Sequence, residues 1–145
     1  MKAPPKDWSR LSTALFYQDA NAAIEWLREA FDFEVRLKVD GDGGRVVHSE
    51  LVYGGAVIMV GDEDAQPAGQ RPFASPKSLG GKSTQAATFY IDDVDAHCAR
   101  ARAAGARITI EPKVSDYGAD YWTDKTYQAA DPEGHLWWFC ERLRG

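Results

Sequence analysis

Cysteine is scarce in this sequence, and its scarcity excludes two kinds of site. Only Cys98 and Cys140 occur among the 145 residues, and they form no CxxC pair. A disulfide framework or a structural zinc site needs more cysteines at closer spacing. We therefore expect two buried thiols in a reducing compartment, and a cytoplasmic location.

Clusters of positive charge and long apolar runs are also missing. Lys and Arg number 17 against 22 Asp and Glu, which gives a formal charge of -5. No basic stripe is dense enough to follow a phosphate backbone, so nucleic acid is not an expected partner. No apolar segment reaches the length of a membrane span, and the N-terminus lacks the pattern of a signal peptide. We expect no membrane contact.

The sequence does contain an internal repeat: each of two segments has the pattern of a strand, a helix and three further strands. Phe16-Tyr17 followed by Asp19 matches Phe89-Tyr90 followed by Asp92, and each acidic residue precedes an amphipathic helical segment. A small sheet with one helix leaves one face bare, so two copies are expected to join their sheets around a shared concave surface. A Rossmann-like sheet is disfavoured because no GxGxxG follows a strand.

The repeat defines the expected domain organisation. The fold class is α+β, with two tandem βαβββ modules forming a cleft. The boundaries are an N-terminal arm at 1–10 and one domain at 11–142, made of module 1 (11–61), a Gly/Pro/Ser-rich linker (62–83) and module 2 (84–142).

Three segments carry a resemblance to a known family: DANAAIEWLREAFDFEV, IDDVDAHCARARAAGARI and DPEGHLWWF. Together they resemble the vicinal oxygen chelate superfamily, which includes glyoxalase I, extradiol dioxygenases and bleomycin-resistance proteins. The resemblance covers residues 11 to 142. It implies two βαβββ modules around a cleft, usually a homodimer, and in the enzymes a divalent metal in the cleft.

The metal positions that the resemblance implies are occupied by other residues here. In metal-binding relatives one ligand lies four residues after the turn glycine of each last strand. Four residues after Gly134 this chain has Trp138, and four after Gly55 it has Met59. The remaining ligand positions, on the opening strands, fall near Ala86, with Gln85 beside it, and near Thr13, with Ser12 beside it. With no His or carboxylate at any of them, we expect no cofactor and a cleft that Trp138 faces with an apolar surface.

Two polar residues of the third strand share a face with the predicted cleft. His48 and Glu50 are two positions apart, and the tight hairpin at Tyr53-Gly54-Gly55 places them on the side of Met59. They could bind a ligand or act as a weak general base, or lie half-exposed at the rim of the sheet. The other histidines are expected outside the cleft: His135 bracing its turn and pointing away with Trp137, and His97 on the solvent side of a helix.

Aromatic residues crowd the segment before the last strand. Tyr117, Tyr121 and Trp122 alternate with Asp116, Asp120 and Asp124, and Tyr127 follows. They could stack on a flat or cationic ligand at the cleft mouth, or cover the sheet edge or a dimer contact.

The sequence therefore supports two functional hypotheses. The first is a non-catalytic protein of the bleomycin-resistance type that sequesters a small aromatic or cationic molecule. Its predicted ligand-binding residues are His48, Glu50, Met59, Gln85, Tyr121, Trp122, Tyr127 and Trp138. The second is a glyoxalase-like lyase or dioxygenase with displaced metal ligands from Gln85, His48 and Glu50. A metal-free enzyme with His48 as base is a third possibility.

Overall fold

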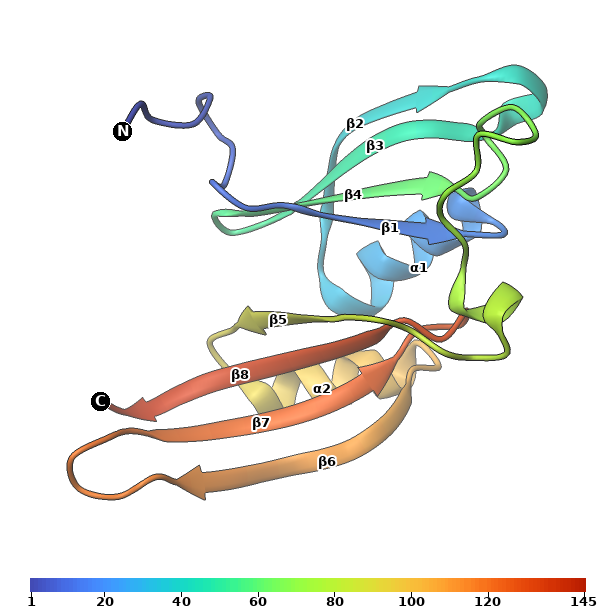
Figure 1. The fold of residues 1–145 in the computed structure, drawn as a ribbon. Coiled ribbons are helices and arrows are strands. Elements are labelled where there is room, and N and C mark those ends of the chain that lie inside the picture. Colours follow the sequence, from blue (N-terminus) through green and yellow to red (C-terminus); the bar gives the residue numbers. More distant parts are fainter.

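The computed structural model describes all 145 residues and contains the repeat that the sequence predicts (Figure 1). Module 1 consists of β1 (Thr13–Tyr17), α1 (Ala20–Phe31), β2 (Glu34–Asp40), β3 (Val46–Tyr53) and β4 (Ala56–Asp62). Module 2 consists of β5 (Ala86–Tyr90), α2 (Val94–Ala103), β6 (Arg107–Asp116), β7 (Thr123–Ala130) and β8 (Leu136–Arg144). The α+β class with two βαβββ modules is confirmed.

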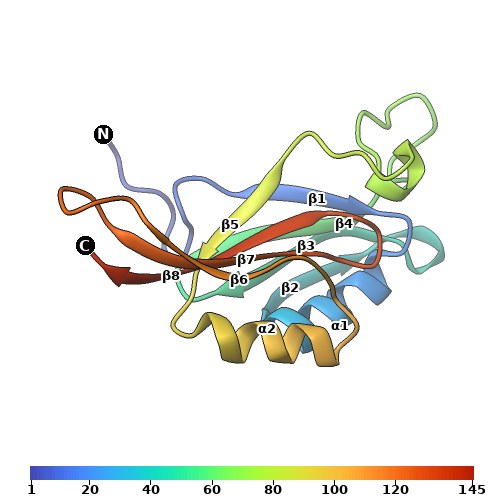
Figure 2. The same ribbon diagram turned by 90° about the horizontal axis from the view of Figure 1, so that it is seen from below.

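Each module forms one four-stranded sheet with the same topology. The strand orders are β1-β4-β3-β2 and β5-β8-β7-β6, with the first pair parallel and the others antiparallel. The edge strands β1 and β5 lie next to each other at the centre of the molecule (Figure 1). Both helices cover the same side of the two sheets (Figure 2). We call that side the helix face and the opposite side the open face.

The first helix begins at the expected cap, Asp19, and the second begins at Asp93, the residue after Asp92. The Asp19 and Asp93 side chains accept hydrogen bonds from the backbone N–H groups of Ala22 and Ala96, which satisfies donors that a helix leaves unpaired. The longest helix, α1, has 12 residues, and no helix has the length and apolarity needed to cross a membrane.

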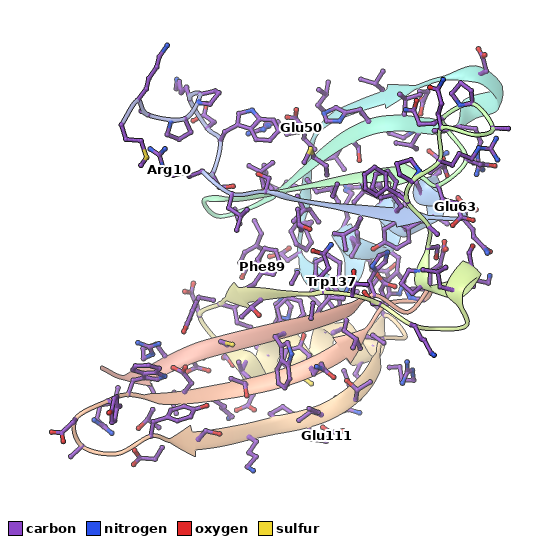
Figure 3. The ribbon with its side chains drawn as sticks, viewed as in Figure 1. Arg10, Glu50, Glu63, Phe89, Glu111 and Trp137 are labelled. Atoms are coloured by element: carbon purple, nitrogen blue, oxygen red, sulfur yellow. The ribbon has the colours of Figure 1, made fainter.

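The helix faces of both sheets contribute to one core. Phe31 and Phe33 at the end of α1 pack against Trp137 and Phe139 of β8, with ring centroids 4.7 to 5.8 Å apart. Phe89 of β5 joins the same cluster (Figure 3). Because these rings come from both modules, the two sheets are held in one arrangement by shared burial of aromatic surface.

A buried carboxylate joins the modules at the turn before β8. Asp131 Oδ1 accepts the backbone N–H groups of residues 133, 134 and 135. Its Oδ2 accepts the Tyr17 hydroxyl at 2.6 Å and the Trp137 indole at 3.1 Å. Burial, together with the Asp131 charge, raises the pKa of Tyr17. Every acceptor site of this buried charge is thus used, as a stable interior carboxylate requires.

The predicted linker packs against both modules. It contains a short 3-10 helix, η2 (Pro76–Leu79), and its Phe73 ring stacks on Phe16 of β1 with centroids 4.3 Å apart. Glu133 accepts hydrogen bonds from Ser75 and from the backbone N–H of Gln18. These contacts fix the linker beside the end of β1.

Candidate functional site

On the first sheet, the open face carries Met59 with a neighbour on each side. Glu50 of β3 is the cross-strand partner of Met59, and Ala14 of β1 lies beside it on the other side. Figure 3 labels Glu50 on this sheet. Leu51 and Ile58, one position away, are fully buried on the helix face. The sequence placed Glu50 and Met59 on one face correctly, because a two-residue hairpin fixes the register.

A β-bulge adds a residue that the sequence analysis did not identify. Val35 pairs with Leu51 and Leu37 with Glu50, so Arg36 is an extra residue in β2. Its guanidinium reaches Glu50 Oε2 through Nε at 2.8 Å and through a terminal nitrogen at 2.7 Å. Bulges re-aim side chains in this way. Glu50 is therefore paired inside its own sheet.

The same carboxylate also binds His48. His48 Nε2 lies 3.1 Å from Glu50 Oε1. The hydrogen bond from His48, together with Arg36, lowers the pKa of Glu50. The N-terminal arm adds to this group, because the Trp8 ring stacks on Arg36 at 4.9 Å and the Asp7 carbonyl accepts a hydrogen bond from it. The Arg36 cluster consists of Trp8, Arg36, His48 and Glu50.

On the second sheet, Trp138 is half-buried on the open face. Its partners are Thr88 of β5 and Gln128 of β7. The neighbouring Trp137 is fully buried on the helix face. Trp137 takes part in the ring contacts and in the indole hydrogen bond to Asp131, whereas the Trp138 indole takes part in no ring pair and no side-chain hydrogen bond within the chain. Part of its flat apolar surface therefore remains exposed on the open face.

The two halves of the open face correspond residue by residue. Ile108 pairs with Ala129 and Ile110 with Gln128, so Thr109 is the extra residue in β6, as Arg36 is in β2. Thr109 Oγ1 donates to Gln128 Oε1 at 2.8 Å. Arg36, Glu50 and Met59 in module 1 therefore correspond to Thr109, Gln128 and Trp138 in module 2. The first set contains an ion pair, Arg36 with Glu50, whereas all residues of the second set are neutral.

Further aromatic surface lies at the far end of the second sheet. The Arg142 guanidinium stacks on Tyr90 at 5.4 Å and on Trp122 at 5.1 Å, while it binds the Asp124 carboxylate. Tyr121 is 62% exposed in the adjacent hairpin. Because Asp124 already pairs with Arg142, its charge is compensated within the chain.

Tyr127 and His97 were placed wrongly from the sequence. Tyr127 pairs with Phe139 on the helix face and is fully buried, so it does not line the open face beside Trp138. His97 is buried too, with its Nδ1 2.6 Å from the Tyr127 hydroxyl and its Nε2 3.3 Å from the Phe31 carbonyl. Burial lowers the pKa of His97 and raises that of Tyr127.

The register expected for the opening strands was also wrong. Thr13 pairs with Ile58 on the helix face, and the residue beside Met59 is Ala14. Gln85 precedes β5 and donates a hydrogen bond to Thr13 at 3.1 Å. Both residues line a cavity of about 550 Å³ in the seam between the sheets. Gln85 is therefore separated from the position beside Trp138, which Thr88 occupies.

His135 points away from the open face as expected. Its backbone N–H donates to Asp131, and its imidazole Nε2 lies 2.8 Å from the Phe16 carbonyl. The side chain is nearly buried and braces the turn.

The residues of the open face do not fit the divalent metal of the family's enzymes. No group of three or more His, Cys, Asp or Glu side chains is arranged to hold a metal ion. Glu50 has one oxygen on Arg36 and the other on His48. On the opening strands β1 and β5, the residues beside Met59 and Trp138 are Ala14 and Thr88. Catalytic sites normally use three protein ligands, which the open face does not supply.

Comparison with known proteins identifies the family. The family model of the Glyoxalase/Bleomycin resistance protein/Dioxygenase superfamily matches residues 10–139. Uncharacterized proteins of Mycobacterium bovis and Mycobacterium tuberculosis are each 35% identical to this chain over 134 residues. The match covers 92% of this chain, and 84% and 75% of the respective relatives.

Solved structures share the fold over nearly the whole chain. TioX from Micromonospora sp. ML1 is 28% identical with a TM-score of 0.69, over 92% of this chain and 95% of TioX. A glyoxalase/bleomycin resistance protein/dioxygenase family enzyme from Burkholderia phytofirmans is 18% identical with a TM-score of 0.66, over 91% and 97%. The second likeness concerns the fold alone. The chain belongs to the glyoxalase/bleomycin resistance protein/dioxygenase superfamily.

Proposed function

We propose that this protein binds a small planar aromatic molecule on its open face, without a metal and without catalysis. The observation that carries the proposal is Trp138, an indole that has no aromatic partner in the chain and lies where the resemblance placed a metal ligand. Stacking on a tryptophan adds about 0.5–1.5 kcal/mol to the burial of apolar area. Thr88 and Gln128 on either side offer hydrogen bonds that would orient the molecule.

The charges of the open face favour a neutral aromatic molecule over a cation. Glu50 is paired with Arg36, and Asp124 with Arg142. A cationic ligand would have to compete with these guanidinium groups for the carboxylates. Tyr121 and Trp122, in contrast, remain exposed, although Arg142 stacks on the Trp122 ring.

A homodimer belongs to the same proposal. Large side chains at the open end of the second sheet are exposed: Tyr90 by 58%, Trp122 by 40% and Leu143 by 46%. A second copy covering this end would remove apolar surface from water and enclose the bound molecule. Light scattering coupled to size exclusion measures the mass directly: twice 16.0 kDa supports the dimer, and 16.0 kDa contradicts it.

The alternative is a lyase or dioxygenase with displaced ligands, and one binding experiment separates the two. We would titrate the protein with 6-methoxyquinoline by calorimetry in the presence of EDTA. Saturable binding that weakens at least tenfold in Trp138→Ala supports the proposal, since removal of the indole takes away its main contact. Thr126→Ala, on the same face, serves as the control variant. Absence of binding, or binding that Trp138→Ala leaves unchanged, contradicts the proposal.

A further inference from the structure

The Arg36 cluster sets the tautomer of the neutral His48 ring. A carboxylate accepts hydrogen bonds and has none to donate. Glu50 is held as a carboxylate by two hydrogen bonds from Arg36, and its side chain is only 12% exposed. The proton in the 3.1 Å contact between the two side chains therefore belongs to His48 Nε2. In the neutral ring this leaves the lone pair on Nδ1.

His48 Nδ1 has no hydrogen-bond partner in the chain. The imidazole makes one hydrogen bond, the one to Glu50, and its side chain is 38% exposed. It lies on the open face, because Glu50 pairs with Met59 there and His48 is two positions away. His48 thus carries an unpaired acceptor on the open face, the face on which Trp138 also lies.

Apolar side chains surround this acceptor. Val39 is the cross-strand partner of His48 and is 43% exposed, and Leu37 is the partner of Glu50 and is 42% exposed. The bulge at Arg36 brings both onto the open face, since it shifts the alternation of β2 by one residue. Leu37 and Val39 lie on β2, the outer strand of the first sheet, and extend the apolar surface beside His48.

We propose that His48 selects the ligand: Nδ1 accepts a hydrogen bond from a hydroxyl or N–H group on the edge of the aromatic molecule. The ligand class is then a planar aromatic compound that carries a hydrogen-bond donor, such as a phenol. Glu50 and Arg36 act as positioning residues that set which ring nitrogen carries the proton. This inference rests on the proposed function of the open face.

The test compares a compound that carries a hydroxyl donor with its methyl ether, which has none. Calorimetry at pH 7.5 would give the affinities of 6-hydroxyquinoline and 6-methoxyquinoline for the wild type, His48→Phe and His48→Gln. We expect the hydroxyl compound to bind the wild type about tenfold more tightly. His48→Phe keeps a ring but has no acceptor, so the preference should disappear, while His48→Gln supplies an amide oxygen and should keep part of it.

The outcomes separate this inference from the proposed function. Equal affinity of both compounds for the wild type overturns the selection by His48 and leaves aromatic binding in place. Binding of neither compound overturns both proposals. The ¹⁵N chemical shifts of the imidazole provide a second measurement that requires no variant to fold. A proton on Nδ1 with the lone pair on Nε2 in the free wild type would also overturn the inference.

Discussion

Gln128 lies directly across from Trp138 on the open face, in the place that Glu50 takes across from Met59 in the other module. The two halves thus present the same backbone with different chemistry. One half has an ion pair that a bulged arginine completes, and the other has an indole beside neutral hydrogen-bonding groups. This difference suits a ligand with a flat body and one polar edge.

The Asp131 carboxylate should be essential for stability. In Asp131→Asn an NH₂ group would replace one of the two carboxylate oxygens. That oxygen is either Oδ2, which accepts from Tyr17 and Trp137, or Oδ1, which accepts from three backbone N–H groups. We expect a loss of about 3 kcal/mol in the free energy of unfolding, measured by urea denaturation. Asp116→Asn in the exposed hairpin is the control and should cost less than about 1 kcal/mol. A small loss in Asp131→Asn would show that the turn is not held by this charge.

Removal of the Arg36 side chain should destabilise the first sheet. Arg36→Met leaves Glu50, whose side chain is 12% exposed, without its main cationic partner. The expected loss is about 2 kcal/mol in the free energy of unfolding. Lys38→Met removes an edge-strand ion pair with Asp40 and should change stability by less than about 1 kcal/mol. Similar losses in both variants would argue against a special role of the bulge.

His97 should make stability depend on pH. Burial lowers its pKa in the folded chain, whereas the unfolded chain keeps the ordinary value of about 6.5. The unfolded state therefore binds more protons below that value, and stability is lost as pH falls. We expect the free energy of unfolding to drop more between pH 7.5 and 5.0 in the wild type than in His97→Gln. A constant difference between the two proteins across this range would contradict the assignment.

Metal analysis should find no stoichiometric metal. The protein would be purified without a tag and titrated with Zn, Ni, Mn and Fe(II). We expect no metal binding that depends on Glu50, because Arg36 and His48 already bind its carboxylate. A retained ion near one per chain, lost in Glu50→Ala, would instead support the alternative enzyme.

The repeat, the helix caps and the separation of Trp137 from Trp138 could be predicted because each follows from local spacing. Alternation along β8 is uninterrupted from Leu136 to Cys140, so adjacent tryptophans must face opposite sides. The buried face of α2 could also be predicted from the sequence, because Val94, His97, Cys98 and Ala101 have helical spacing. Use of this pattern would have placed His97 in the core.

The bulges could not be predicted from the sequence. An extra residue such as Arg36 or Thr109 leaves no local pattern, yet it changes which side chains reach the open face. For this reason Leu37 and Val39 were not recognised as residues of the open face. Gln128 and Thr88 were missed because their importance depends on pairing with Trp138 across strands that lie far apart in the sequence.

The central claim, that aromatic ligands stack on Trp138, is tested most directly by the indole N–H signals in a ¹H–¹⁵N correlation spectrum. The chain has five tryptophans, and Trp138→Phe assigns the signal of interest by its disappearance. On titration with 6-hydroxyquinoline we predict a saturable shift of the Trp138 signal, while the signals of the buried Trp137 and of Trp26, whose N–H binds the Ala104 carbonyl, stay in place. An unmoved Trp138 signal at saturating ligand would contradict the account.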